Sequence, residues 1–230
     1  MRFLIREDAS EKRRYTALEE HFAARGLQDC VAATSWIDDA IQVKDSWWPM
    51  IKMEWIEGRT LDSYVDYLVE QRNKEASVAL AASWRKHVAR LQAADFAHGD
   101  LQHGNVLVDM SSALRLVDFD GSWISGFKDW PEPPERGNPN YQRMDRTWGQ
   151  WMDTFPALVI YAGLLVLSRL PDAWRILYDG ENLLAFRTSR WGYLGDLLGG
   201  PSALLKASRD RASTSEAMLR NRRALSNHAW

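Results

Sequence analysis

At 230 residues and a formal net charge of −2, the chain is long enough to bury a core but lacks the basic excess that binds nucleic acid or anionic membranes. Cys30 is its only cysteine, which excludes an internal disulfide framework and favours a reducing, cytoplasmic location. The longest apolar run, residues 155–167, is shorter than the roughly 20 residues that span a bilayer. It predicts a fully buried core helix. We therefore expect neither nucleic acid nor membrane among the partners.

The first quarter of the chain predicts short strands and one helix. Tyr15, Leu18 and Phe22 have helical spacing, and Gly26 is expected to end that helix. A polar turn and Pro49 are expected to separate the second strand from the third. The predicted elements are strands at residues 2–6, 41–43 and 50–56 and a helix at residues 9–24.

The rest of the chain predicts mainly helices. Asp153 or Thr154 is expected to cap the third of them, which is expected to break at Pro171. The predicted elements are helices at residues 60–72, 77–94 and 153–178, strands at 106–108 and 114–117, and an irregular segment at 131–139. Strands followed by helices suit a two-lobed α+β protein with a cleft at the junction.

One loop and one turn carry the residues with the clearest chemistry. The loop spans residues 98–105, and Asp118 follows thirteen residues after Asn105. Phosphoryl transfer needs a carboxylate near the attacking hydroxyl and oxygen ligands for the magnesium on the nucleotide phosphates. Asp100, Asn105 and Asp118 have the types and the order for those tasks.

These residues carry a resemblance. The loop His98-Gly99-Asp100-Leu101-Gln102-His103-Gly104-Asn105 resembles the catalytic loop H-R-D-L-x-x-x-N of protein kinases, and Asp118-Phe119-Asp120-Gly121 resembles D-F-G. The H-G-D spelling is also similar to that of aminoglycoside phosphotransferases. The ensemble most resembles bacterial protein-kinase-like proteins of the eukaryotic-like Ser/Thr kinase superfamily, with an H-G-D-L-Q-H-G-N loop, a D-[FY]-D-G turn and a later N-Y-Q, here residues 140–142.

The resemblance implies a protein-kinase-like two-lobed fold. It implies a partial N-terminal lobe and hinge over residues 1–57, a mainly helical C-terminal lobe over 58–205 and a polar, Arg-rich tail over 206–230. Glu54 and Trp55 would belong to the hinge that covers the adenine, and Arg2 falls near the position of the phosphate-binding lysine.

The resemblance also assigns roles. Asp100 would accept the proton of the attacking hydroxyl, while Asn105 and Asp118 would hold magnesium on ATP. His98 would pack beneath Phe119. Asp153 would anchor the catalytic loop. Two readings of Asp120 stay open: a further carboxylate near the metal, or a solvated or helix-capping residue.

Three departures from the kinase pattern have consequences. Gly99 replaces an arginine that usually pairs with a phosphorylated loop, so we expect no dependence on such a phosphate. Gln102 replaces a lysine, so the transition state is stabilised less or another group substitutes. The sequence contains no G-x-G-x-x-G hairpin, so we expect weak ATP binding, either because Met1 is internal to a longer gene or because the kinase is degenerate.

The leading hypothesis is an ATP- and Mg-dependent transferase acting on a hydroxyl, with protein Ser/Thr as the expected acceptor. The alternative is a pseudokinase, a nucleotide-binding or scaffold module without turnover. A third hypothesis, an antibiotic kinase, requires an acidic pocket from the C-terminal helices. The acidic residues there are scattered: Asp172, Asp179, Glu181 and Asp196.

Overall fold

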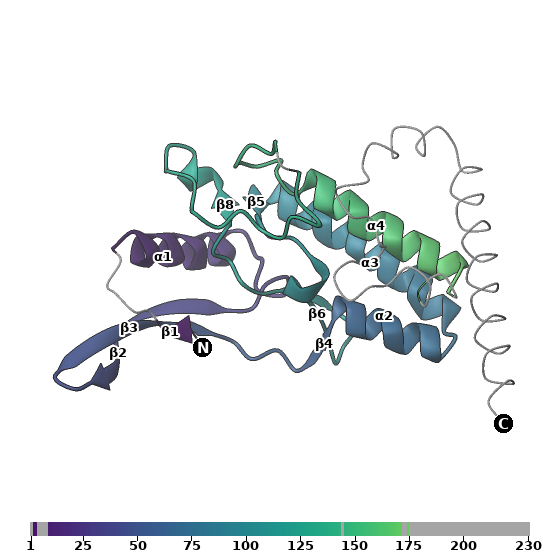
Figure 1. Ribbon diagram of the computed structural model, residues 1–230, viewed down its shortest axis with the longest axis horizontal. Helices are drawn as coiled ribbons and strands as arrows, with labels where there is room; N and C mark the ends of the chain where they lie inside the picture. The colour runs from purple at the N-terminus through teal and green to yellow at the C-terminus, as the bar shows by residue number, and fades with distance from the viewer. Residues whose placement is uncertain (1, 4–8, 144, 172–173, 175–230) are drawn as a thin grey trace, which may run out of the picture.

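The computed structural model describes residues 2–3, 9–143, 145–171 and 174. Over these residues the protein is a mixed α+β structure, with small sheets and three long helices gathered at one end (Figure 1). The predicted tail at 206–230, the end of the first predicted strand and the four scattered acidic residues Asp172, Asp179, Glu181 and Asp196 lie outside the described residues.

The N-terminal part is an antiparallel sheet with one helix beside it. Its elements are β1 (Arg2–Phe3), α1 (Ala9–Ala24), β2 (Thr34–Val43) and β3 (Ser46–Met53), with strand order β1-β3-β2. Tyr15, Leu18 and Phe22 are all buried, so the predicted apolar face of α1 is confirmed. Gly26 follows the helix with φ of +64°, a conformation that glycine adopts readily, and the predicted helix end is confirmed.

Pro49 lies inside β3, and the prediction that it helps to separate two strands was wrong. The turn of the hairpin lies at residues 44–45, and β2 begins at Thr34 instead of the predicted Ile41. The register passes from Ile37 opposite Met50 to Ile41 opposite Trp48, so residues 38–40 of β2 face Pro49 alone. A proline has no N–H to donate, and a bulge on the partner strand accommodates that gap in the ladder.

The helices follow the prediction closely. They are α2 (Leu61–Glu70), α3 (Lys74–Ala93) and α4 (Thr154–Arg169). Helix α3 begins three residues before the predicted start at residue 77. The Asn73 side chain caps it there, accepting a hydrogen bond from the Ala76 N–H at 3.0 Å. Helix α4 ends two residues before Pro171, so the predicted break there is confirmed.

Helix α4 is buried on one face only, which corrects the prediction of a fully buried helix. Ala157, Ile160 and Leu164 lie in the core, whereas Leu158 is 60% exposed. The buried face packs on α3, where the Trp84 indole N–H donates to the Ala157 carbonyl at 3.0 Å. Within the described part of the chain, every helix is too short or too polar to cross a membrane.

Between the two ends lie the short strands that position the loops. They are β4 (Gly58–Thr60), β5 (Phe96–Ala97), β6 (Val106–Asp109), β7 (Leu114–Leu116) and β8 (Trp123–Ile124), with the 3-10 turns η1 (His103–Asn105) and η2 (Ser125–Phe127). They form one sheet of order β4-β6-β7 and the pair β5-β8. The hairpin β6-β7 was predicted and is confirmed.

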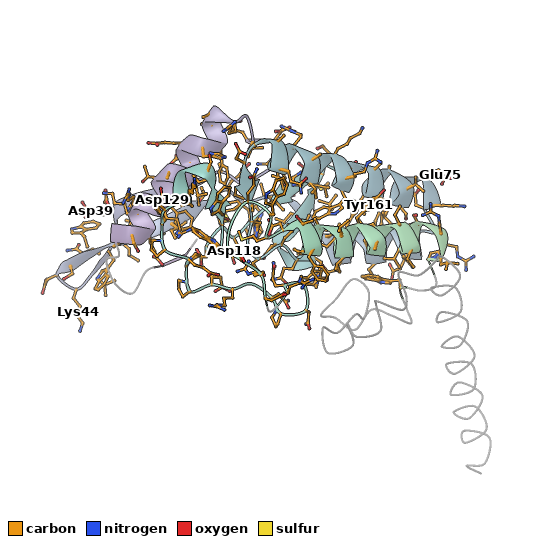
Figure 2. The ribbon with its side chains drawn as sticks, turned by 90° about the horizontal axis from the view of Figure 1, so that it is seen from above. Asp39, Lys44, Glu75, Asp118, Asp129 and Tyr161 are labelled. Carbon is orange, nitrogen blue, oxygen red and sulfur yellow. The ribbon has the colours of Figure 1, made fainter. Side chains whose placement is uncertain are left out.

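A cluster of aromatic rings joins α1 to these strands. The Phe22 ring meets Phe96 and Phe119 edge-on, each at 5.2 Å between ring centroids. Because Phe119 directly follows Asp118, this contact fixes the backbone that carries the predicted metal ligand. Figure 2 shows Asp118 between the hairpin that carries Asp39 and Lys44 and the helical end that carries Glu75 and Tyr161.

Candidate functional site

The backbone of the loop before Asp100 is held from both sides. The Asp153 carboxylate accepts the N–H groups of His98 and Gly99, the latter at 3.0 Å. On the other side the Gly99 carbonyl accepts bonds from Gln142 Nε2 at 3.2 Å and from the Arg146 guanidinium at 2.7 Å. The predicted role of Asp153 as anchor of the loop is confirmed. Its predicted side-chain cap on α4 is wrong, because the carboxylate turns to the loop instead.

His98 has a structural place, as predicted. It is fully buried, and its ring lies 5.8 Å from the Phe119 ring, edge-on. Its Nδ1 faces the Asp100 N–H at 3.3 Å, so Nδ1 accepts, and Nε2 then donates to the Val117 carbonyl at 2.8 Å. This pair of bonds assigns the neutral Nε2-protonated tautomer and ties the two loops together.

The Asp100 carboxylate accepts hydrogen bonds from three neighbours. Asn138 N–H donates to Oδ1 at 2.6 Å, and the Nδ2 group of Asn105 and the Nε2 group of Gln102 donate to Oδ2 at 2.8 and 2.9 Å. All three groups are donors, so Asp100 acts as the acceptor in each of these bonds. Its plane and rotamer are therefore fixed in advance of any reaction.

Asn105 connects Asp100 to Asp118. Its Nδ2 group also donates to the Asp100 carbonyl at 2.8 Å, and its own carbonyl accepts the Val117 N–H at 3.1 Å. Asp118 follows at once, exposed and with φ of +67°. A non-glycine residue in this left-handed region is uncommon and is concentrated at functional sites. The structure thus joins Asp100 to Asn105 directly, and Asn105 to the backbone just before Asp118.

The predicted nucleotide-binding residues lie on the N-terminal side, and they differ in what engages them. The Glu54 carboxylate accepts bonds from the Arg115 guanidinium at 2.7 Å and the Ala33 N–H at 3.0 Å, and its N–H donates to the Ala33 carbonyl. Its side chain is therefore committed to the fold. Trp55 is 90% exposed. The backbone of Arg2 pairs with Ile51 in the sheet.

Asp120 has a third role that neither reading anticipated. Its Oδ1 accepts the hydroxyl of the buried Tyr15 of α1 at 2.5 Å. The carboxylate therefore links α1 to the turn that follows Asp118. Sequence patterns could not show this, because the two residues are 105 positions apart.

A cleft of about 540 Å³ opens beside Asp100. One wall is the loop that carries Asp100, and the other is the segment 135–140, to which the sequence analysis assigned no role. The N-Y-Q match at 140–142 was the sequence signal that could have drawn attention to this segment. Its Tyr141 contacts the loop that carries Asp100, because the Tyr141 hydroxyl lies 2.6 Å from Nδ1 of His103, which is 7% exposed. The lining residues are Asp100, Gln102, His103, Glu135, Gly137, Asn138, Pro139 and Asn140.

The site contains oxygen ligands suited to a hard cation. Asn105 uses its Nδ2 group toward Asp100, which leaves its Oδ1 as a possible ligand, and the exposed Asp118 carboxylate is a second. Oxygen-only donors of this kind match magnesium rather than zinc. In the described residues there is no group of three or more His, Cys, Asp or Glu side chains that could hold a metal ion by themselves.

The comparisons with known proteins add no family to this description. No protein-family model matches the chain, and no curated protein matches it with significant similarity.

Proposed function

We propose that the protein is an ATP- and Mg-dependent phosphotransferase with a protein-kinase-like two-lobed fold that acts on a hydroxyl group. One observation carries the proposal: the Asn105 side chain bonds to Asp100, which lines a cleft, and the Asn105 carbonyl accepts the N–H of Val117, the residue before Asp118. A base, an amide ligand and a carboxylate ligand are the groups that this chemistry needs on the protein side.

The element order supports the same proposal. A strand bearing Arg2, helix α1, the strands β2 and β3 and the exposed segment at Glu54 and Trp55 precede the helices, in the order that the resemblance implies. Since the Glu54 side chain and N–H are engaged within the fold, we assign adenine recognition to the backbone that follows, at Trp55.

In the proposed reaction the acceptor hydroxyl binds in the cleft and donates its hydrogen bond to Asp100. The hydroxyl oxygen forms a new bond to the γ-phosphorus of ATP, the bond from that phosphorus to the bridging oxygen breaks, and ADP leaves. Asp100 accepts the released proton. Magnesium, when bound by Asn105 and Asp118, supplies charge neutralisation on the phosphates. The fixed carboxylate contributes by orientation, since no group has to reorganise.

One observation favours the pseudokinase alternative. No Lys or Arg side chain is among the described residues that line the cleft. Gln102, at the position of the kinase lysine, is a neutral amide whose polar atoms are bonded to Asp100 and Asn138. Such a site binds a nucleotide with less stabilisation of the charge that develops during transfer.

Two measurements separate the hypotheses. Calorimetric titration should show MgATP binding about tenfold weaker or more in Asp118→Asn, because the side chain at position 118 loses its charge and keeps its shape. Asp129→Asn is the matched control: Asp129 is an exposed carboxylate that belongs to neither the loop 98–105 nor the turn at Asp118, and its substitution should change nothing. Equal binding by wild type and Asp118→Asn would remove Asp118 from the metal site.

Transfer of labelled γ-phosphate to Ser/Thr peptides and to hydroxylated small molecules tests turnover. Asp100→Asn should lower the rate by about 10²–10⁴ with ATP affinity retained. Binding without transfer to any acceptor would establish the pseudokinase. Absence of both MgATP binding and transfer would overturn the proposal.

A further inference from the structure

Asp100, Gln102 and Asn138 form a closed ring of hydrogen bonds. The Asn138 N–H donates to Asp100 Oδ1 at 2.6 Å, Asn138 Nδ2 donates to Gln102 Oε1 at 2.9 Å, and Gln102 Nε2 donates to Asp100 Oδ2 at 2.9 Å. Every donor in the ring meets an acceptor. The orientation of both amides is therefore determined by the carboxylate.

The two loops meet closely enough for this ring because of Gly137. A Cβ atom there would lie 2.6 Å from the Gly99 carbonyl oxygen and 3.0 Å from Asp100 Oδ1, and the residue has φ of +74°. The N–H of Asn140 adds a bond to Asn138 Oδ1 at 2.9 Å, which holds the Asn138 amide in the orientation that the ring requires. Segment 135–140 is thus built onto the carboxylate.

The ring limits what Asp100 can still bind. An ionised carboxylate has roughly four lone-pair positions. Asn138 occupies one on Oδ1, while Gln102 and Asn105 occupy the two on Oδ2. One position is left, on Oδ1, the oxygen that the cleft-lining Asn138 also contacts.

We infer that Asn138 and Gln102 are positioning residues that hold Asp100 with a single acceptor position, on Oδ1, where the substrate hydroxyl binds. Gln102 then orients the Asp100 carboxylate. The lysine at this position of protein kinases instead stabilises the transferring phosphate. The inference rests on the proposed function for the identity of the bound hydroxyl, but the ring itself can be tested without it.

The ring is tested by solvent exchange of the Gln102 side-chain amide protons in the intact protein, followed by NMR. In wild type we expect them to exchange at least about tenfold more slowly than those of a free glutamine, because their donor nitrogen is bonded and half-buried. Asn138→Ala should remove most of that protection, since Gln102 loses its second partner. Wild-type exchange at the rate of free glutamine would overturn the inference, whether or not the protein transfers phosphate.

The positioning role is tested by a rescue. In Asn138→Asp a carboxylate oxygen replaces the Nδ2 group and repels Gln102 Oε1. If the Gln102 amide turns over, its Nε2 group meets the new carboxylate, but its Oε1 then faces and repels Asp100 Oδ2. A lysine at 102 can donate to both carboxylates, so Asn138→Asp combined with Gln102→Lys should recover function. We expect Asn138→Asp to lower kcat about a hundredfold with KM for ATP unchanged, and the double variant to come within about threefold of wild type.

Asn73→Asp is the matched control. It makes the same chemical change outside the cleft, and the bond from the Ala76 N–H to the side-chain oxygen of residue 73 is kept by aspartate. An equal loss of kcat in Asn73→Asp, or failure of the double variant to recover, would overturn the positioning role. If wild type transfers phosphate to no acceptor, the proposed function fails, and the amide exchange alone decides the ring.

Discussion

Gly99 and Gly121 meet backbone to backbone. A Cβ atom on Gly99 would lie 2.2 Å from the carbonyl oxygen of Gly121, and Gly99 has φ of +81°. The same Gly121 carbonyl accepts the Trp148 indole N–H at 3.1 Å, so it is held in place. This contact gives a steric reason for the glycine that precedes Asp100 where the kinase pattern has an arginine: the backbone arrangement leaves no room for a side chain.

Gly99→Ala should therefore destabilise the fold by about 2–4 kcal/mol, from left-handed strain together with the clash. Urea unfolding measures the change. Gly126→Ala is the control, because its Cβ would make an ordinary contact of 3.8 Å with the Ile124 side chain. Equal stability changes in the two variants would contradict the close approach of Gly99 and Gly121.

Asp153→Ala should destabilise the protein by about 2–5 kcal/mol, because the N–H groups of His98 and Gly99 in the loop before Asp100 lose their acceptor. Burial raises the pKa of the Asp153 carboxyl, while the bonds from the His98 and Gly99 N–H groups favour its charged form. Asp153→Asn keeps one oxygen acceptor and should lose less. Thermal unfolding distinguishes the variants, with the exposed Asp145→Ala as a control that should leave the melting temperature nearly unchanged. A wild-type melting temperature for Asp153→Ala would argue against the anchor.

His87→Phe should reduce the loss of stability in acid. His87 is 6% exposed and stacks on Trp84, and its Nε2 atom has no hydrogen-bond partner among the described residues. Burial, with a contribution from Arg90, lowers its pKa from 6.5 to about 4. Between these values the unfolded chain binds a proton that the folded protein does not, so stability falls as pH falls through this window.

At about pH 5 this proton uptake costs about 2 kcal/mol relative to neutral pH, and Phe, which stacks but does not titrate, should remove that part. Denaturant unfolding of both proteins near pH 7.5 and pH 5 tests the prediction. The same dependence on pH in wild type and variant would show that His87 is protonated as easily in the folded protein as in the unfolded chain.

Cys30 should be nearly inert toward thiol reagents in the native protein. It is 1% exposed, and burial raises the pKa of its thiol from 9.0 to about 11. Near pH 8 the thiolate fraction is then about a hundredfold lower than for an ordinary thiol. Reaction with a chromogenic disulfide should be slow until denaturant is added. Immediate labelling of the folded protein would contradict the burial of Cys30.

Local patterns in the sequence were enough to predict the helices and the hairpin that frames the loops. The bounds of α1 agree with the prediction, because apolar residues at helical spacing and a terminating glycine act within a few residues of one another. The bulge opposite Pro49 and the one-sided burial of α4 were missed, since both depend on which neighbour packs against the element.

The sequence by itself also indicated the residues for which we propose a role in phosphoryl transfer: Asp100, Asn105 and Asp118 stand out by type and order. Only the tertiary structure decided what surrounds them. Asp100 bonds to Asn138 across 38 positions and Asp120 to Tyr15 across 105. Contacts at such separations leave no periodic trace in the chain, because they arise from the way the loops close against one another once the core has packed.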